Sequence, residues 1–142
     1  TRTFSKAYAL AGLRVGYGLA SAAVADLMNR VRQPFNVNNL ALAGALAALD
    51  DVDFLNASYE LNRAGMAQIV AALDQLGLEH IPSCGNFVTF RAGDAAAVNQ
   101  KLLQQGVIVR PIAGYGLPEW LRVTIGKAEE NARFIEALQK AL

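Results

Sequence analysis

The sequence has too few thiol and imidazole side chains for several common chemistries. One cysteine, Cys84, and one histidine, His80, occur among its 142 residues. A single cysteine forms neither an internal disulfide nor a multi-thiolate metal site, and a lone imidazole has no second histidine with which to share a metal ion. We therefore expect no metal centre, and the cysteine usage favours a reducing compartment.

An excess of one charge and a long apolar run are also missing. Thirteen Lys and Arg residues against 12 Asp and Glu leave a net charge of +1, which is too balanced for a basic stripe that neutralises many phosphates. Charged and amide residues interrupt every apolar stretch before it could cross a bilayer, and the start resembles no signal peptide. We expect a cytoplasmic protein with neither nucleic acid nor membrane as a partner.

The remaining composition is that of a packed globular fold, because 54% of the residues are hydrophobic and only 4 are prolines. The chain opens on Thr1 without an initiator methionine, so we expect a fragment of a longer protein. The sequence pattern changes near residue 54, which favours a division into two domains, 1–54 and 55–142.

Strands and helices are predicted in alternation along the chain. A short buried strand is expected at residues 15–20, and Ser21 offers an N-cap for a helix that ends before Pro34. The almost uniformly apolar stretch 39–49 predicts a helix that must be covered on most of its sides. A longer helix follows and ends at Gly77.

The C-terminal half continues this alternation on a small sheet. The predicted strands are 79–81, 87–90, 107–110 and 120–125, and the predicted helices are 95–105, closed by Gly106, and 128–140. Strands interleaved with helices indicate the α/β class, with an α+β small domain at the C-terminal end.

Four residues near the start form the first candidate site. A lysine such as Lys6 forms a Schiff base with a carbonyl compound when its amine is neutral. Hydroxyls at Thr3 and Ser5 and the guanidinium of Arg14, which has glycines on both sides, would supply donors for a phosphate. The alternative is a solvated lysine and an arginine in a surface ion pair, and composition and spacing alone favour it.

The second candidate site lies in the predicted strand 120–125. A period of two puts Leu121, Val123 and Ile125 on one face, so Arg122 points away from that apolar face. An arginine fork matches a carboxylate or phosphate bidentately. From the pattern alone, an ordinary exposed strand arginine is the favoured alternative.

A resemblance to a known family reverses these odds. Residues 5–17 (SKAYALAGLRVGY) closely resemble the lysine motif of fold-type I, pyridoxal-phosphate-dependent aminotransferases, and are most similar to the histidinol-phosphate aminotransferase family. Three later stretches fall in the same order as in that family: 33–38 (QPFNVN), 106–111 (GVIVRP) and 115–126 (YGLPEWLRVTIG). The resemblance covers essentially the whole chain.

The resemblance implies specific roles for six residues. It implies that Lys6 holds pyridoxal 5'-phosphate as a Schiff base and moves the substrate's α-proton. The residues that it implies for the cofactor phosphate are Thr3, Ser5 and Arg14. It further implies that Arg122 binds the substrate anion, with Arg110 as a second anion-binding residue.

The resemblance also implies an activity and an assembly. The parent protein is expected to be a homodimer that transfers the amino group of glutamate to imidazole-acetol phosphate in histidine biosynthesis, giving histidinol phosphate and 2-oxoglutarate. Residues 1–54 would be the tail of the large cofactor domain and 55–142 the small C-terminal domain. The isolated chain is expected to be inactive, because the family's other cofactor-binding groups lie upstream of the lysine.

Other functions remain open at this point. One is an aromatic or other amino-acid aminotransferase on the same scaffold, and another is a threonine-phosphate decarboxylase. A third is a non-catalytic α+β module for binding or oligomerisation.

The remaining polar residues are predicted to be structural. We expect His80 to be a satisfied or exposed strand residue and Cys84 a small, nearly apolar side chain. Asn86 resembles a family position near the substrate, but a turn asparagine is an equal alternative. Glu129 and Glu130 suit the first turn of the last helix, where negative charge is favourable.

Overall fold

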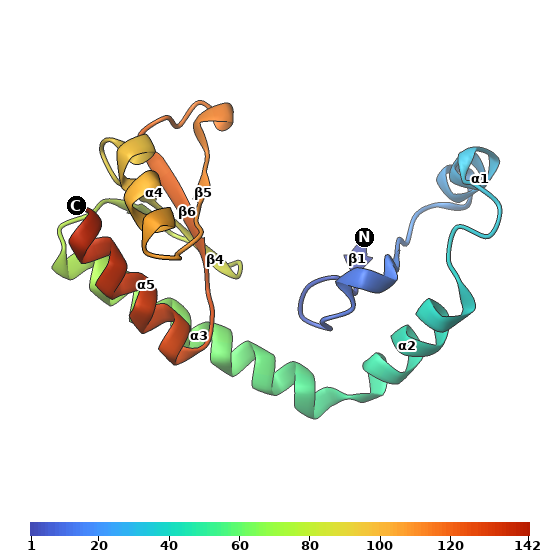
Figure 1. Ribbon diagram of the computed structural model, residues 1–142. Helices are drawn as coiled ribbons and strands as arrows, with labels where there is room; N and C mark the ends of the chain where they lie inside the picture. Colours follow the sequence, from blue (N-terminus) through green and yellow to red (C-terminus); the bar gives the residue numbers. More distant parts are fainter. The chain divides into compact units, whose positions relative to one another are not determined.

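The computed structural model describes residues 1–142, which divide into two compact units, Thr1–Tyr59 and Glu60–Leu142 (Figure 1). The first unit contains a two-stranded antiparallel sheet of β1 (Arg2–Thr3) and β2 (Gly16–Tyr17), a short 3-10 helix η1 (Ala11–Leu13), and the helices α1 (Ala22–Val31) and α2 (Asn39–Asp50). Helix α3 (Val52–Gln75) begins in this unit and ends in the next. The assignment of 1–54 and 55–142 to two domains of a longer protein stays a prediction.

Side-chain caps start both short helices, as the sequence predicts for the first of them. The hydroxyl of Ser21 accepts a hydrogen bond from the N–H of Val24 at 3.5 Å, and α1 ends ahead of Pro34. The side-chain oxygen of Asn38 accepts one from the N–H of Ala41 at 2.8 Å. These bonds satisfy amide groups that have no partner within the helix.

The prediction of a buried strand at residues 15–20 is wrong. Strand β2 has only two residues, Gly16 and Tyr17, and both are exposed, whereas Val15 just before it is buried. The reason is that β2 pairs only with the two-residue β1. The buried residues of this unit form a small cluster of Phe4, Val15, Ala41 and Ala45.

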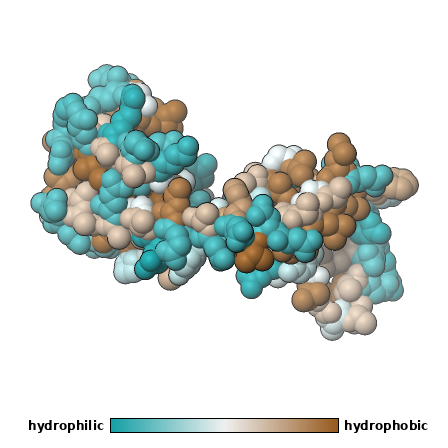
Figure 2. Space-filling model, turned by 90° about the horizontal axis from the view of Figure 1, so that it is seen from below, coloured by the Kyte–Doolittle hydropathy of each residue, from teal (hydrophilic) through white to brown (hydrophobic).

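Large apolar side chains remain exposed on α1, on α2 and in the segment between them. Hydrophobic surface gathers on the part of the molecule that carries these helices in Figure 2. The exposed set comprises Val24, Leu27, Met28 and Val31 on α1, Phe35 between the helices, and Leu40, Leu42, Leu46 and Leu49 on α2. Apolar helix surfaces of this kind are stable when further protein covers them.

The second unit is a four-stranded antiparallel sheet with helices packed against it (Figure 1). The strand order is β3-β4-β6-β5. Besides the C-terminal part of α3, the elements are β3 (His80–Ile81), β4 (Phe87–Arg91), α4 (Ala95–Gln104), β5 (Arg110–Pro111), the 3-10 helix η2 (Ala113–Tyr115), β6 (Trp120–Thr124) and α5 (Ala128–Ala141). The expected α/β class, with helices packed on a small sheet, is confirmed, and the sheet is antiparallel throughout.

Glycines end α3 and α4 where the sequence predicts. Gly77 has a φ of +66°, its N–H donates to the carbonyl of Asp74, and the N–H of Leu78 donates to the carbonyl of Leu73. Gly106, with a φ of +74°, closes α4 with the same pair of bonds. Glycine suits this left-handed position because it has no Cβ to clash.

One face of the sheet forms the main core. Leu121 and Val123 of β6 and Val88 and Phe90 of β4 are buried together with residues of α3, α4 and α5. The opposite face carries the alternate side chains, including Arg122, so the predicted alternation of β6 is confirmed. No helix combines the length and the hydrophobicity needed to cross a membrane.

The predicted strand 107–110 is wrong over most of its length. Strand β5 contains only Arg110 and Pro111. The N–H of Val107 donates to the carbonyl of Leu102 at 2.9 Å, as part of the C-terminal cap of α4. The chain is therefore still leaving the helix where the sequence pattern predicts a strand.

Candidate functional site

Lys6 lies in an exposed loop that is closed at its base by Phe4. The N–H of Phe4 donates to the carbonyl of Val15 at 3.1 Å, and its own carbonyl accepts from the N–H of Leu10 at 2.9 Å. The Phe4 side chain is buried and its ring contacts that of Tyr8, with centroids 4.9 Å apart. This anchor holds the loop by its base while the Lys6 side chain stays exposed.

The close pairing of β1 with β2 requires glycine at position 16. A Cβ added to Gly16 would lie 2.6 Å from the carbonyl oxygen of Arg2, which no side chain tolerates without moving the backbone. Thr3 is the direct partner of Gly16 in this pairing. The glycine therefore positions the start of the lysine loop.

Arg14 has an unusual backbone conformation beside the same loop. Its φ is +55°, in the left-handed region that non-glycine residues rarely adopt. One guanidinium nitrogen, Nη1, donates to the carbonyl of Ala11 at 2.8 Å, and the side chain is exposed. The guanidinium makes no salt bridge, so its remaining donors are free to bind an anion.

The local charge of this segment is entirely positive. Residues 1–25 contain the cations Arg2, Lys6 and Arg14 and no acidic residue, since the first carboxylate of the sequence is Asp26. Thr3 Oγ1 accepts a hydrogen bond from the N–H of Ser5 at 3.1 Å, which joins two of the predicted residues. No hydrogen bond joins Lys6 to Arg14. Hydroxyls and unpaired cations of this kind suit a phosphate group.

In the second unit, Arg110 and Arg122 are direct partners across β5 and β6. Two like charges opposite each other in a sheet repel. Neither guanidinium forms a salt bridge. Both arginines line a groove of about 430 Å³, whose lining is Ile108, Val109, Arg110, Pro111, Arg122 and Thr124. An anion in this groove would relieve the repulsion. The structure therefore brings the two predicted substrate-binding residues together on one groove.

A third arginine on this face has a different environment. The Arg91 guanidinium lies 2.7 Å from a carboxylate oxygen of Glu119 and 3.6 Å from one of Glu79. The hydrogen bond and charge of Glu119, with a smaller contribution from Glu79, raise the pKa of Arg91 above its ordinary value. The positive charge of Arg91 is therefore balanced within the chain, whereas those of Arg110 and Arg122 are not.

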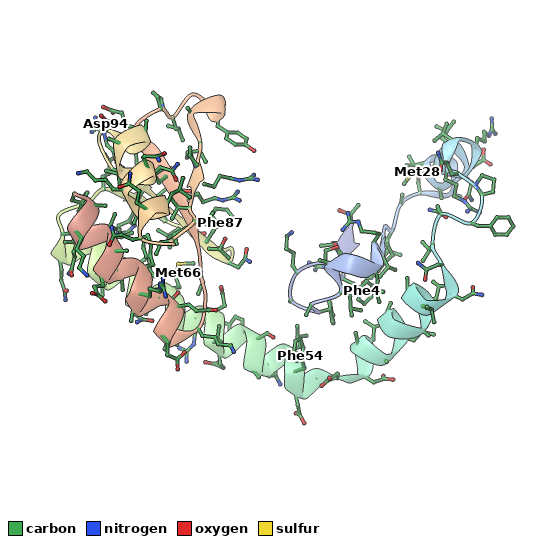
Figure 3. All side chains as sticks on the ribbon, viewed as in Figure 1. Phe4, Met28, Phe54, Met66, Phe87 and Asp94 are labelled. Atoms are coloured by element: carbon green, nitrogen blue, oxygen red, sulfur yellow. The ribbon has the colours of Figure 1, made fainter.

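Phe87 was not expected from the sequence as part of this site: its ring lies under the Arg122 guanidinium with 4.8 Å between Cζ and the ring centroid. Phe87 is labelled in Figure 3, at the start of β4. The available signal was the alternation of β4: Val88 and Phe90 are buried in the core, so Phe87 and Thr89 belong to the arginine face. An aromatic residue on the face opposite the core indicates a contact with another side chain on that face.

Several of the other polar candidates make structural contacts. His80 Nε2 lies 3.0 Å from a carboxylate oxygen of Asp74, whereas its buried Nδ1 has no hydrogen-bond partner, so the prediction of a satisfied histidine holds for one ring nitrogen only. Cys84 is exposed, and Asn86 contributes its carbonyl to the N–H of Ile125 at 2.8 Å. The carboxylate of Glu130 accepts from the N–H of Lys127 at 2.7 Å and so caps α5, as expected for a structural residue.

Comparisons with known proteins identify the family of the chain. The sequence profile of the family described as aminotransferase class I and II matches residues 1–138. The chain is 78% identical over 141 residues to histidinol-phosphate aminotransferase 1 of Dechloromonas aromatica, covering 99% of this chain and 39% of the relative. It is 62% identical to histidinol-phosphate aminotransferase 2 of Nitrosospira multiformis, covering 100% of this chain and 36% of the relative.

A solved structure extends the comparison to the fold. The crystal structure of histidinol-phosphate aminotransferase from Sinorhizobium meliloti, in complex with pyridoxal-5'-phosphate, matches with a TM-score of 0.87 and 30% identity. The match covers 98% of this chain and 39% of that chain. The chain therefore spans less than half the length of the relatives that it matches.

Proposed function

The chain belongs to the class I and II aminotransferase family, and on that premise we propose that it is part of a histidinol-phosphate aminotransferase. The protein would transfer an amino group from glutamate to imidazole-acetol phosphate, giving histidinol phosphate and 2-oxoglutarate. The observation that carries this proposal is the pair of unbalanced cationic sites, one around Lys6 and Arg14 and one formed by Arg110 and Arg122.

The first site fits the phosphate and aldehyde groups of pyridoxal 5'-phosphate. Arg14 offers guanidinium donors that no carboxylate engages, and Thr3 and Ser5 offer hydroxyl groups from the same short loop. Phosphate is bound well by such a combination of charge and hydroxyl donors. We therefore assign Thr3, Ser5 and Arg14 to the cofactor phosphate and Lys6 to the covalent attachment.

When bound, pyridoxal phosphate supplies an electron-withdrawing ring that makes the substrate's α-proton acidic. The chain's own contribution is the Nζ atom of Lys6, which accepts that proton and returns it to a different carbon. The exposed loop around Lys6 gives this amine access to a bound molecule, while the Phe4 anchor keeps the loop in one place.

The second site fits the acidic groups of the substrates. Glutamate brings a carboxylate and histidinol phosphate brings a phosphate, and an arginine fork binds either one bidentately. Arg122 would bind a substrate anion and Arg110 would be the second anion-binding residue. Because neither arginine is neutralised within the chain, both charges are available to the substrate.

We also propose a cytoplasmic homodimer as the working form. The exposed apolar side chains of α1 and α2 would be covered in this form by the rest of the polypeptide and by a second subunit. The chain on its own is then expected to be inactive. Size-exclusion chromatography with light scattering on the full-length protein tests the dimer.

The decisive experiment measures the activity of the full-length protein with competing substrates. Amino transfer to 2-oxoglutarate should be faster with histidinol phosphate than with phenylalanine, because a phosphate dianion can engage both arginines more strongly than the single carboxylate of phenylalanine can. Preference for phenylalanine would instead indicate an aromatic aminotransferase, and release of carbon dioxide from threonine phosphate would indicate a decarboxylase. A Lys6→Ala variant that keeps full amino-transfer activity would contradict the proposal.

A further inference from the structure

We propose that Phe87 is a positioning residue for Arg122: its ring holds the guanidinium ready to receive a substrate carboxylate. This inference rests on the proposed function, in which Arg122 binds the substrate anion. Phe87 itself touches no reacting atom. Its effect passes through the arginine that lies over its ring.

The register of the sheet brings the two side chains together. Phe87 of β4 is the direct partner of Thr124 of β6, and Arg122 is two residues before Thr124 on the same face. The guanidinium carbon lies 4.8 Å from the ring centroid, within the range of a cation–π contact. The backbone pairing of β4 with β6 makes these two side chains neighbours, so the contact does not depend on the position of a loop.

The contact keeps the arginine's charge available. Arg122 Nε is buried and has no hydrogen-bond partner in the chain. A carboxylate in the place of the ring would hold the guanidinium but would also neutralise it, as Glu119 does for Arg91. An aromatic ring restrains the guanidinium by its face and leaves the N–H groups free for another anion.

The Phe87 ring also packs against the turn that contains Gly85. A Cβ added to Gly85 would lie 3.1 Å from Cε1 of Phe87, so the ring packs closely against this glycine. The carbonyl of Gly85 accepts a hydrogen bond from the side-chain amide of Asn62 on α3, and its N–H donates to the hydroxyl of Ser83. A line of contacts therefore runs from α3 through the turn and the ring to Arg122.

Restraint of Arg122 before binding should strengthen binding. A free arginine side chain samples many rotamers, and an anion that binds it must remove this freedom. When the ring has already selected one orientation, the cost of ordering is smaller. Phe87 should thus affect substrate affinity much more than the rate of the chemical step.

The test compares two substitutions of Phe87 in the full-length protein. Phe87→Leu keeps an apolar side chain but removes the ring, whereas Phe87→Tyr keeps the ring. Phe134→Leu is the matched control, because Phe134 of α5 packs against Phe90 of β4 in the core and not against Arg122. Binding of glutarate, a dicarboxylate without a reactive amino or keto group, is measured by calorimetry, and KM and kcat for amino transfer are measured alongside.

We expect Phe87→Leu to raise the glutarate Kd and the KM by roughly three- to thirtyfold, with kcat within about twofold of the unsubstituted protein. Phe87→Tyr should restore both constants, and Phe134→Leu should lower the thermal midpoint without changing them. An unchanged Kd in Phe87→Leu, or a Phe87→Tyr variant as weak as Phe87→Leu, would overturn the proposal. Failure of the proposed function is a different result, since the unsubstituted protein would then show no amino transfer with histidinol phosphate.

Discussion

Arg91 and Arg122 lie on the same face of one sheet, but only Arg91 is paired with carboxylates of the chain. Glu119 and Glu79 balance the charge of Arg91, whereas Arg122 has an aromatic ring as its neighbour and another arginine, Arg110, as its strand partner. An unbalanced pair of guanidinium groups in a groove is a feature that stability alone does not favour. The proposed role in binding a substrate anion would account for this pair.

Removal of Arg122 should weaken substrate binding much more than removal of Arg91. In the full-length protein we expect Arg122→Ala to lower kcat/KM for amino transfer by about 10- to 100-fold, from the loss of charge-assisted hydrogen bonds. Arg91→Ala, the matched control, should remain within about twofold, because surface ion pairs contribute little. Steady-state kinetics with histidinol phosphate and with glutamate check both variants. Equal losses in the two would exclude a special role for Arg122.

Replacement of Lys6 should abolish catalysis without affecting the fold. Lys6→Ala removes the amine assigned to proton transfer, and we expect kcat to fall by at least about 10²- to 10⁴-fold. The side chain is exposed, so the thermal midpoint of the cofactor-free protein, measured by circular dichroism, should change little. Lys127→Ala, another exposed lysine, serves as the control and should retain full activity. An active Lys6→Ala variant would remove the basis for the cofactor assignment.

Gly16 should not tolerate a methyl group. The added Cβ would approach the carbonyl oxygen of Arg2 to 2.6 Å, so Gly16→Ala must separate β1 from β2 or distort the backbone. A loss of about 1 to 3 kcal/mol in local stability is expected, together with weaker cofactor retention. Gly12→Ala is the control, because nothing lies within 4 Å of a Cβ there.

These glycine variants are compared by cofactor release on dialysis and by the unfolding midpoint. If Gly16→Ala retains the cofactor as well as Gly12→Ala does, the pairing of β1 with β2 does not position the lysine loop.

Asn131 should be essential for the connection between β6 and α5. Its side chain is buried, accepts a hydrogen bond from the N–H of Gly126 at 2.9 Å, and donates to the carbonyl of Gly126 and to Gln68. Asn131→Ala leaves these groups unpaired and should cost about 1 to 3 kcal/mol of unfolding free energy. Asn99→Ala is the control, because Asn99 Oδ1 is buried without a partner and its loss should cost less than about 0.5 kcal/mol.

Urea denaturation of the full-length variants measures both changes. Equal destabilisation by the two substitutions would mean that the bonds to Gly126 are not the source of the stability.

Several elements could be predicted because their signals are local. Ser21 caps α1, Gly77 ends α3 and Gly106 ends α4, since each depends on hydrogen bonds between residues close in sequence. The alternation of β6 also predicted that Arg122 lies on the face of the sheet opposite the core, because a strand that covers a core on one face must alternate.

The two wrong strand predictions, 15–20 and 107–110, lie where contacts with residues elsewhere in the chain override the local sequence pattern. Val107 has the β-branched character of a strand residue, but its N–H is used by the cap of α4. The apolar segment after Val15 has only a two-residue strand as its partner and therefore remains exposed. In both cases the available hydrogen-bond partner, and not the side-chain pattern, decides the length of the strand.

The sequence by itself determined the family, and it picked out the lysine segment and the two arginines that we propose bind an anion, because these depend on residue types in a fixed order. Only the tertiary structure decided that Arg110 and Arg122 stand opposite each other without a carboxylate, and that the ring of Phe87 supports one of them. The physical reason is that strand register and the partners of a charge are relations between residues far apart in the chain. No local pattern encodes them.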